Sequence, residues 1–235
     1  MRRVLATILV CVCCAAIPAL ADTIIVGAPA TPDHSFCYPF GCAFTGEYQQ
    51  IYTHSLFPGP ITITGLEFFS TVDYSFHPTA MNSGLWTISL STTSVDWNTM
   101  SHDFASNIGA DDTQVFSGDL AQPWAFGDTL HIDLTTPFTY DPNHGNLLMT
   151  VNASNTSDAN GIVVFDVNLG NDYTTRGYTY CGHNCVDVGA GLVTGFNTAA
   201  PTVPEPGTLL LLCPGVLGLA GALRRRSRQV VGSAR

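Results

Sequence analysis

The chain contains no lysine, so its eight Lys and Arg residues are all arginines. Seven of these arginines lie near the two ends of the chain, which leaves Arg176 as the only one between Asp22 and Val203. That segment holds seventeen acidic residues, so its net charge is about −16, against −10 for the whole chain. Phosphate binding depends on clustered Lys and Arg, and a nucleic-acid partner is therefore excluded.

Recognisable catalytic motifs are also missing from the sequence. There is no G-x-S-x-G turn, no H-E-x-x-H pair and no glycine-rich phosphate loop, and the seven histidines are scattered singly. We therefore predict that the protein is not an enzyme. A secreted glycoside hydrolase remains the less favoured alternative, because it needs only two carboxylates at a set distance. Glu47 and Glu67 are the candidates for that pair.

The N-terminal 21 residues have the pattern of a signal peptide. Arg2 and Arg3 precede an apolar stretch over residues 4–17, and Ala19 and Ala21 supply the small residues that a signal peptidase recognises. We expect an apolar signal helix, cleavage by signal peptidase, and a mature chain that starts at Asp22. The protein is therefore predicted to be exported.

Residues 200–235 combine a linker, a proline motif, an apolar run and a basic tail. The motif is Val203-Pro204-Glu205-Pro206-Gly207, the apolar run covers residues 208–223, and the tail over 224–235 begins with Arg224, Arg225, Arg226 and Arg228. Sixteen helical residues extend about 24 Å, against a hydrocarbon core of about 30 Å. Snorkelling arginines make up the difference and stay on the cytoplasmic side, so we predict a transmembrane helix.

This order of proline motif, apolar run and arginine cluster resembles the PEP-CTERM sorting signal of exported proteins in Gram-negative bacteria. The resemblance implies transient anchoring in the membrane, processing by an exosortase-type membrane protease, and a final location at the cell surface or outside the cell. It also implies an association with exopolysaccharide systems. We expect a structural or adhesive component of the cell envelope or extracellular matrix, with a carbohydrate-binding module as the alternative.

The body, residues 22–199, is predicted to be one all-β domain. Trp86, Ile88 and Leu90 alternate with polar residues, as in a strand with one buried face, and no helical period persists for a dozen residues. The predicted strands cover residues 61–63, 66–69, 84–91, 114–117, 129–135, 147–151 and 161–167, the last as a central strand. Their spacing favours an antiparallel β-sandwich of the jelly-roll or immunoglobulin-like kind, with a closed barrel as the alternative.

Four cysteines remain in the body, and export to an oxidising compartment favours disulfides. Four cysteines allow three pairings, of which we favour Cys37 with Cys42 and Cys181 with Cys185. The alternative for the second pair is a zinc site formed by Cys181, His183 and Cys185. Its spacing departs from the usual zinc motif, and an oxidising compartment disfavours free thiolates.

Two further sets of residues are candidates for ligand binding. Asp111, Asp112 and Asp141 lie in predicted loops and present the oxygen ligands that calcium prefers, so they are the candidates for a structural calcium site, while no cofactor is predicted. Trp97 and Trp124 lie in turn-like segments, where an exposed ring would stack on a sugar of an extracellular polysaccharide. Packing of these rings against the core is the competing interpretation, since large aromatic residues are mostly buried.

Overall fold

The structure is a computed structural model that describes residues 22–29, 31–72, 78–180 and 182–199. The predicted signal peptide, transmembrane segment and sorting motif lie outside these residues. In the ranges that are described, no helix is long and apolar enough to cross a membrane. One compact unit, Ala21–Ala199, contains all the strands of the described residues.

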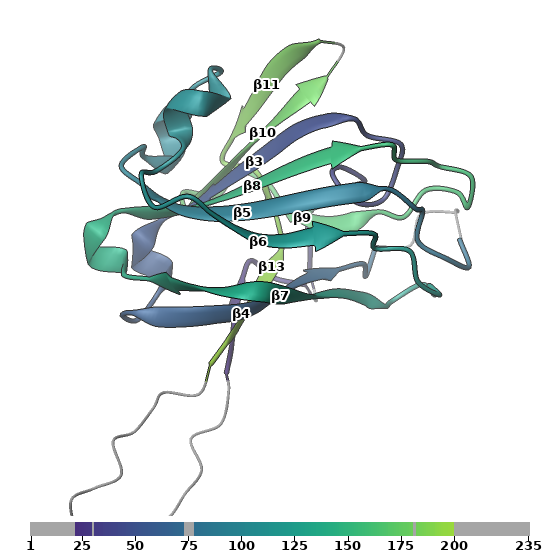
Figure 1. Cartoon of the computed structure of the whole chain (residues 1–235), viewed down its shortest axis with the longest axis horizontal. Helices are drawn as coiled ribbons and strands as arrows, with labels where there is room; N and C mark the ends of the chain where they lie inside the picture. Colours follow the sequence, from purple (N-terminus) through teal and green to yellow (C-terminus); the bar gives the residue numbers. More distant parts are fainter. Residues whose placement is uncertain (1–21, 30, 73–77, 181, 200–235) are drawn as a thin grey trace, which may run out of the picture. The chain divides into compact units, whose positions relative to one another are not determined.

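Antiparallel strands dominate this unit and form two large sheets, shown in Figure 1. The four-stranded sheet has the order β1 (Thr23–Val26), β13 (Thr194–Thr198), β4 (Ile61–Phe69) and β7 (Thr129–Tyr140). The six-stranded sheet has the order β11 (His183–Val188), β10 (Thr174–Tyr180), β3 (Gly46–Tyr52), β8 (Asn146–Ser154), β5 (Leu85–Thr93) and β6 (Thr113–Gly118).

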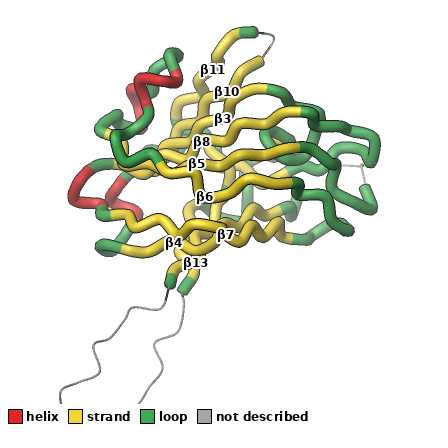
Figure 2. Tube along the Cα trace, viewed as in Figure 1, coloured by secondary structure: helices red, strands yellow, loops and turns green. Residues whose placement is uncertain are grey.

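A short third sheet and four 3-10 helices complete the fold. The three-stranded sheet has the order β12 (Gly191–Leu192), β9 (Phe165–Asn168) and β2 (His34–Phe36). The helices are η1 (His54–Leu56), η2 (Trp97–Thr99), η3 (Phe104–Asn107) and η4 (Pro142–His144). Figure 2 shows how small the helical share (red) is beside the strands (yellow).

One hydrophobic core joins the three sheets. The alternating residues Trp86, Ile88 and Leu90 of β5 are fully buried, as predicted, and pack in the same cluster as Leu66 of β4 and Ile132 of β7. The indole Nε1 of Trp86 donates a hydrogen bond to a backbone carbonyl, so its one polar atom is satisfied inside the core. Period-two alternation therefore identified the buried face of this strand correctly.

The two large sheets approach each other along β6 and β7. The Thr135 hydroxyl on β7 donates to the carbonyl oxygen of Val115 on β6, at 2.9 Å. At the far end of the six-stranded sheet, β11 pairs only with β10 among the described strands (Figure 1). The two edges of this sheet thus have different surroundings.

The predicted antiparallel β-structure is confirmed, and two of the predicted strands need correction. Residues 61–63 and 66–69 form a single strand, β4, with a bulge between Ile63 and Gly65. Of residues 161–167, only the last three belong to a strand, which is the centre of the short sheet. The last strand, β13, extends to Thr198 and pairs with both β1 and β4.

Candidate functional site

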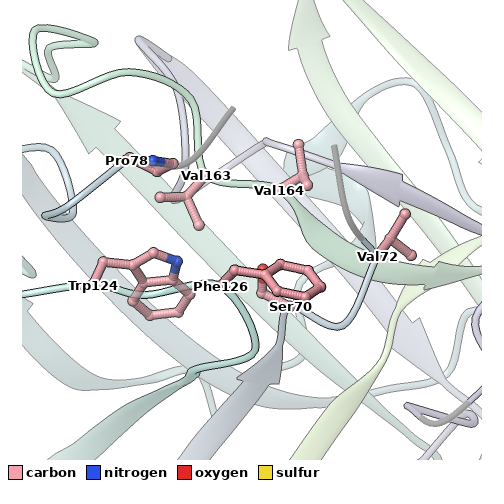
Figure 3. Close-up of a pocket in the computed structure, with 7 residues that line it drawn as sticks. All are labelled: Ser70, Val72, Pro78, Trp124, Phe126, Val163 and Val164. Atoms are coloured by element: carbon pink, nitrogen blue, oxygen red, sulfur yellow. The ribbon is translucent and has the colours of Figure 1, made fainter. Parts of the chain in front are cut away.

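Trp124 is part of the core and not an exposed platform for sugars, which corrects that prediction. Its side chain is 6% exposed, and its ring packs edge to face against Phe165, with centroids 5.8 Å apart. It lines a small pocket with Ser70, Val72, Pro78, Phe126, Val163 and Val164 (Figure 3). The free space there, about 10 Å³, is what one water molecule needs, so no sugar ring fits.

Trp97 begins η2 and is half-buried. It packs against a small cluster formed by Ile51, Met100 and Leu148. The segment between β5 and β6 is held to β3 by two further bonds, from Gln49 Nε2 to the carbonyl of Phe104 (3.0 Å) and from Asn107 Nδ2 to Gln49 Oε1 (2.9 Å). The Trp97 ring therefore helps to anchor this segment to the sheet.

Two of the three predicted calcium ligands, Asp111 and Asp141, accept hydrogen bonds from backbone N–H groups. Asp111 Oδ1 accepts from the backbone N–H of Thr92 at 2.7 Å, and Asp141 Oδ1 accepts from the backbone N–H of Asn143 at 3.0 Å. The bond from Asn143 lowers the pKa of Asp141, whereas burial, followed by the charge of Asp111, raises the pKa of Asp112. Across the described ranges, no three His, Cys, Asp or Glu side chains are grouped to hold a metal ion. Calcium binding stays a prediction.

The two candidate glutamates lie on different sheets. Glu67 on β4 stands between two fully buried neighbours, so it faces away from the core, where it contacts His131 Nδ1 at 3.3 Å. Glu47 on β3 precedes the fully buried Tyr48 and accepts from Gln49 Nε2 at 2.8 Å, on the face covered by η3. The core therefore separates the two carboxylates, and they do not form a catalytic pair.

One of the two predicted disulfides is present. Cys37 and Cys42 are bonded, with their Cα atoms 5.5 Å apart. Cys185 on β11 is a free cysteine. Cys181, which both the second disulfide and the zinc alternative require, lies outside the described residues.

The single arginine of the domain is buried and forms an ion pair with a partly exposed aspartate. The antiparallel register of β10 and β11 places Arg176 opposite Asp187, and both Nε and Nη2 of the arginine donate to Asp187 Oδ2, at 3.0 and 2.9 Å. Arg176 is only 7% exposed, and its guanidinium lies 3.9 Å from the centre of the Phe36 ring. The only formal positive charge in the described part of the chain is thus buried itself and paired with a partly exposed carboxylate.

Three half-buried aromatic rings surround this ion pair. Phe36 contacts Tyr38 and Tyr178, with centroid distances of 5.1 and 5.2 Å, and the two tyrosine rings lie 5.9 Å apart. Burial, followed by the charge of Asp187, raises the pKa of Tyr178. Aromatic faces beside fixed hydrogen-bonding groups are a common lining of ligand sites. We call these five residues, Phe36, Tyr38, Arg176, Tyr178 and Asp187, the Arg176 cluster.

The sequence predictions did not include the Arg176 cluster. Its members come from β2, the loop after it, β10 and β11. Strand pairing joins β10 to β11, and packing of the short sheet places Phe36 beside them. The one available signal was that a domain so rich in acid retains a single arginine. A lone charge of one sign indicates a specific partner, but it does not indicate which of many acids that partner is.

Comparison with known protein families locates the remaining functional feature. A family model described as the PEP-CTERM protein-sorting motif matches residues 202–226. The chain carries a PEP-CTERM sorting motif. The match spans the proline motif, the apolar run and Arg224 to Arg226, and it implies export, processing by an exosortase, transient membrane anchoring and a cell-surface destination in general terms. No curated protein matches the chain.

Proposed function

We propose that this protein is a non-enzymatic structural or adhesive component of the cell surface that associates with exopolysaccharide. The PEP-CTERM motif supports delivery to that location. We assign the domain to the β-sandwich class, because its two large sheets share one core. A compact β-domain that is exported and sorted suits a matrix component.

The observation that carries the proposal is the sign of the exposed charge. Arg176 is buried and paired, whereas these described aspartates are exposed: Asp22, Asp33, Asp96, Asp103, Asp111, Asp112, Asp119, Asp128, Asp133, Asp158 and Asp172. An acidic surface repels an anionic polysaccharide unless divalent cations bridge the two, and calcium prefers carboxylate oxygens. Association with an acidic exopolysaccharide should therefore depend on calcium.

Cosedimentation tests this proposal. The exported protein is mixed with purified exopolysaccharide of its host in calcium or in EDTA, and protein in the pellet is measured. We expect retention in calcium and loss in EDTA. No retention under either condition contradicts the proposal, and release of soluble sugar by the protein would indicate a hydrolase instead.

Sorting has its own test. Changing Pro204, Glu205 and Pro206 together to alanine should leave an unprocessed precursor in the membrane fraction, which immunoblotting detects by size. Pro201→Ala, outside the matched motif, is the control and should mature normally. Normal maturation of the triple variant would contradict processing at this motif.

A second candidate function, a carbohydrate-binding module, is favoured by the Arg176 cluster. Its rings are partly exposed, and the ion pair offers fixed polar atoms beside them. A glycan array with Tyr178→Ala tests it, with Phe126→Ala as the control, because Phe126 is an exposed aromatic residue that lies against the Trp124 pocket. Glycan binding that is lost only in Tyr178→Ala supports this function, and binding unchanged by it removes the site.

A further inference from the structure

The strand β11 ends the six-stranded sheet and leaves one side of its backbone without a neighbouring strand among the described residues. It is six residues long and pairs only with β10 (Figure 1). The opposite edge, β6, is joined to β7 by the bond from Thr135. An open strand edge is a template for pairing with another chain unless charge, proline or a covering segment blocks it.

The hydrogen bonds of β11 show which backbone groups point outward. The carbonyl of Asn184 accepts from His102 Nδ1 at 2.9 Å, so it points away from β10. In an antiparallel ladder the outward residues alternate with inward ones. The N–H and C=O of Val186 therefore also point outward, while those of Cys185 point toward Tyr178 on β10. His102 covers one outward carbonyl, which can still accept a second bond.

The strand β11 itself has no net charge, although the domain as a whole is strongly acidic. The one acid of β11, Asp187, is neutralised by the one arginine of the domain. Proline and lysine are absent from β11, and two apolar side chains near it are exposed, Tyr180 (53%) and Val188 (56%). Two copies with a net charge of about −16 each repel over most of their surface, and this edge is where they approach at least cost.

We propose that β11 pairs antiparallel with β11 of a second copy of this chain, about a two-fold axis at Cys185, and that a disulfide between the two Cys185 residues locks the pair. With the axis at Cys185, Asn184 faces Val186 of the second copy, and the outward groups of both exchange hydrogen bonds. Cys185 then faces itself in a pair without hydrogen bonds, where the Cα atoms lie about 4.5 Å apart. That separation falls within the range from about 4.4 to about 6.8 Å found in disulfides.

Bond formation needs an oxidant outside the protein. The two thiols release two protons and two electrons as the S–S bond forms, and the disulfide of a thiol–disulfide oxidoreductase accepts them to become two thiols. Such oxidants act in the oxidising compartments to which exported proteins are delivered. The covalent step therefore rests on the export in the proposed function, whereas the strand pairing does not.

The covalent step is tested on the full chain, expressed with its export machinery and alkylated before lysis. We expect a band of twice the chain mass on a non-reducing gel, lost with reductant, and a Cys185–Cys185 linked peptide in mass spectrometry. Cys185→Ser should abolish this band, and the matched variant Cys181→Ser should retain it. A monomer with a Cys181–Cys185 link, or with a free Cys185 thiol, overturns the covalent lock.

The strand pairing is tested separately in reductant, by analytical ultracentrifugation of the exported protein. Val186→Pro removes an outward N–H without removing a bond to β10, and Val186→Thr keeps that N–H with a similar shape. Two copies lose two hydrogen bonds, so we expect Val186→Pro to weaken the dimer about tenfold or more. Equal dimerisation of both variants, or a monomeric wild type, overturns the pairing.

The bond between Cys37 and Cys42 separates failure of this inference from failure of the proposed function. If that bond is formed and Cys185 is still unlinked, the covalent lock is wrong while export stands, and the strand pairing is decided by its own test. If Cys37 and Cys42 are themselves reduced, the chain has not reached an oxidising compartment. That result overturns the covalent lock together with the proposed location.

Discussion

The hydroxyl and the backbone N–H of Thr198 both donate to the carbonyl oxygen of Asp22, at 2.8 and 2.9 Å. The two ends of the domain are therefore tied to each other. Since β13 lies between β1 and β4, the strand just before the sorting motif is an internal strand of its sheet. The domain completes its fold only when the chain is present up to this point.

Phe196 on β13 tests how strongly the last strand supports the core. Its ring is fully buried and contacts Tyr52 and Phe57 at centroid distances of 4.9 and 5.5 Å. We expect Phe196→Ala to lower the free energy of unfolding by about 3–5 kcal/mol in urea denaturation, because it leaves a cavity. Phe126→Ala, at a position 50% exposed, is the control and should cost far less. If both variants lose the same unfolding free energy, the proposed contribution of β13 to the core is wrong.

The Arg176–Asp187 pair tests how costly a buried charge is without its partner. Asp187→Asn should lower the free energy of unfolding by about 2 kcal/mol, because the buried guanidinium loses its charged acceptor. Arg176→Met together with Asp187→Asn should restore much of that loss, since no unpaired charge remains. Asp172→Asn, at an exposed position, is the control. A double variant less stable than Asp187→Asn would contradict this account.

The Cys37–Cys42 bond closes a short loop at one side of the core. Replacing both cysteines with serine should cost about 2 kcal/mol of unfolding free energy, as expected for a sequence separation of 5. Thermal denaturation with and without reductant measures this effect. Reductant should lower the melting temperature of Cys185→Ser, but not that of a triple variant in which Cys37, Cys42 and Cys185 are all serine. A reductant effect in the triple variant would point to another bond.

The raised pKa of the half-buried Glu47 side chain leads to a prediction of how stability depends on pH. Burial raises its pKa in the folded protein above the ordinary value of 4.5. The folded state therefore binds the proton more tightly than the unfolded state does, and this glutamate makes the protein less stable as the pH rises through its folded pKa. Glu47→Gln should be more stable than wild type at pH 7, and the difference should vanish below about pH 4.5. Urea denaturation at pH 7 and pH 4 measures it. A Glu47→Gln variant that is less stable than the wild type at pH 7 would contradict this prediction.

Strand prediction succeeded where one face is apolar and the other polar, as in β5 and β7. It failed for β3 and β10, whose buried faces include Gln50, Thr174 and Arg176. Inside the fold these polar groups find partners across strands, such as the bond from Gln50 Nε2 to the carbonyl of Leu192 at 3.0 Å. A polar residue with a distant partner looks like a surface residue in the sequence, so alternation does not reveal it.

The sequence by itself determined the destination of this protein, because the sorting motif and the predicted signal peptide are read as contiguous segments. It also determined the β-class, since alternation is local along each strand. Only the tertiary structure decided that Trp124 belongs to the core, that Glu47 and Glu67 lie apart, and that Arg176 meets Asp187. Each of these facts depends on strand order and register, which join residues far apart in the chain through backbone hydrogen bonds and shared burial.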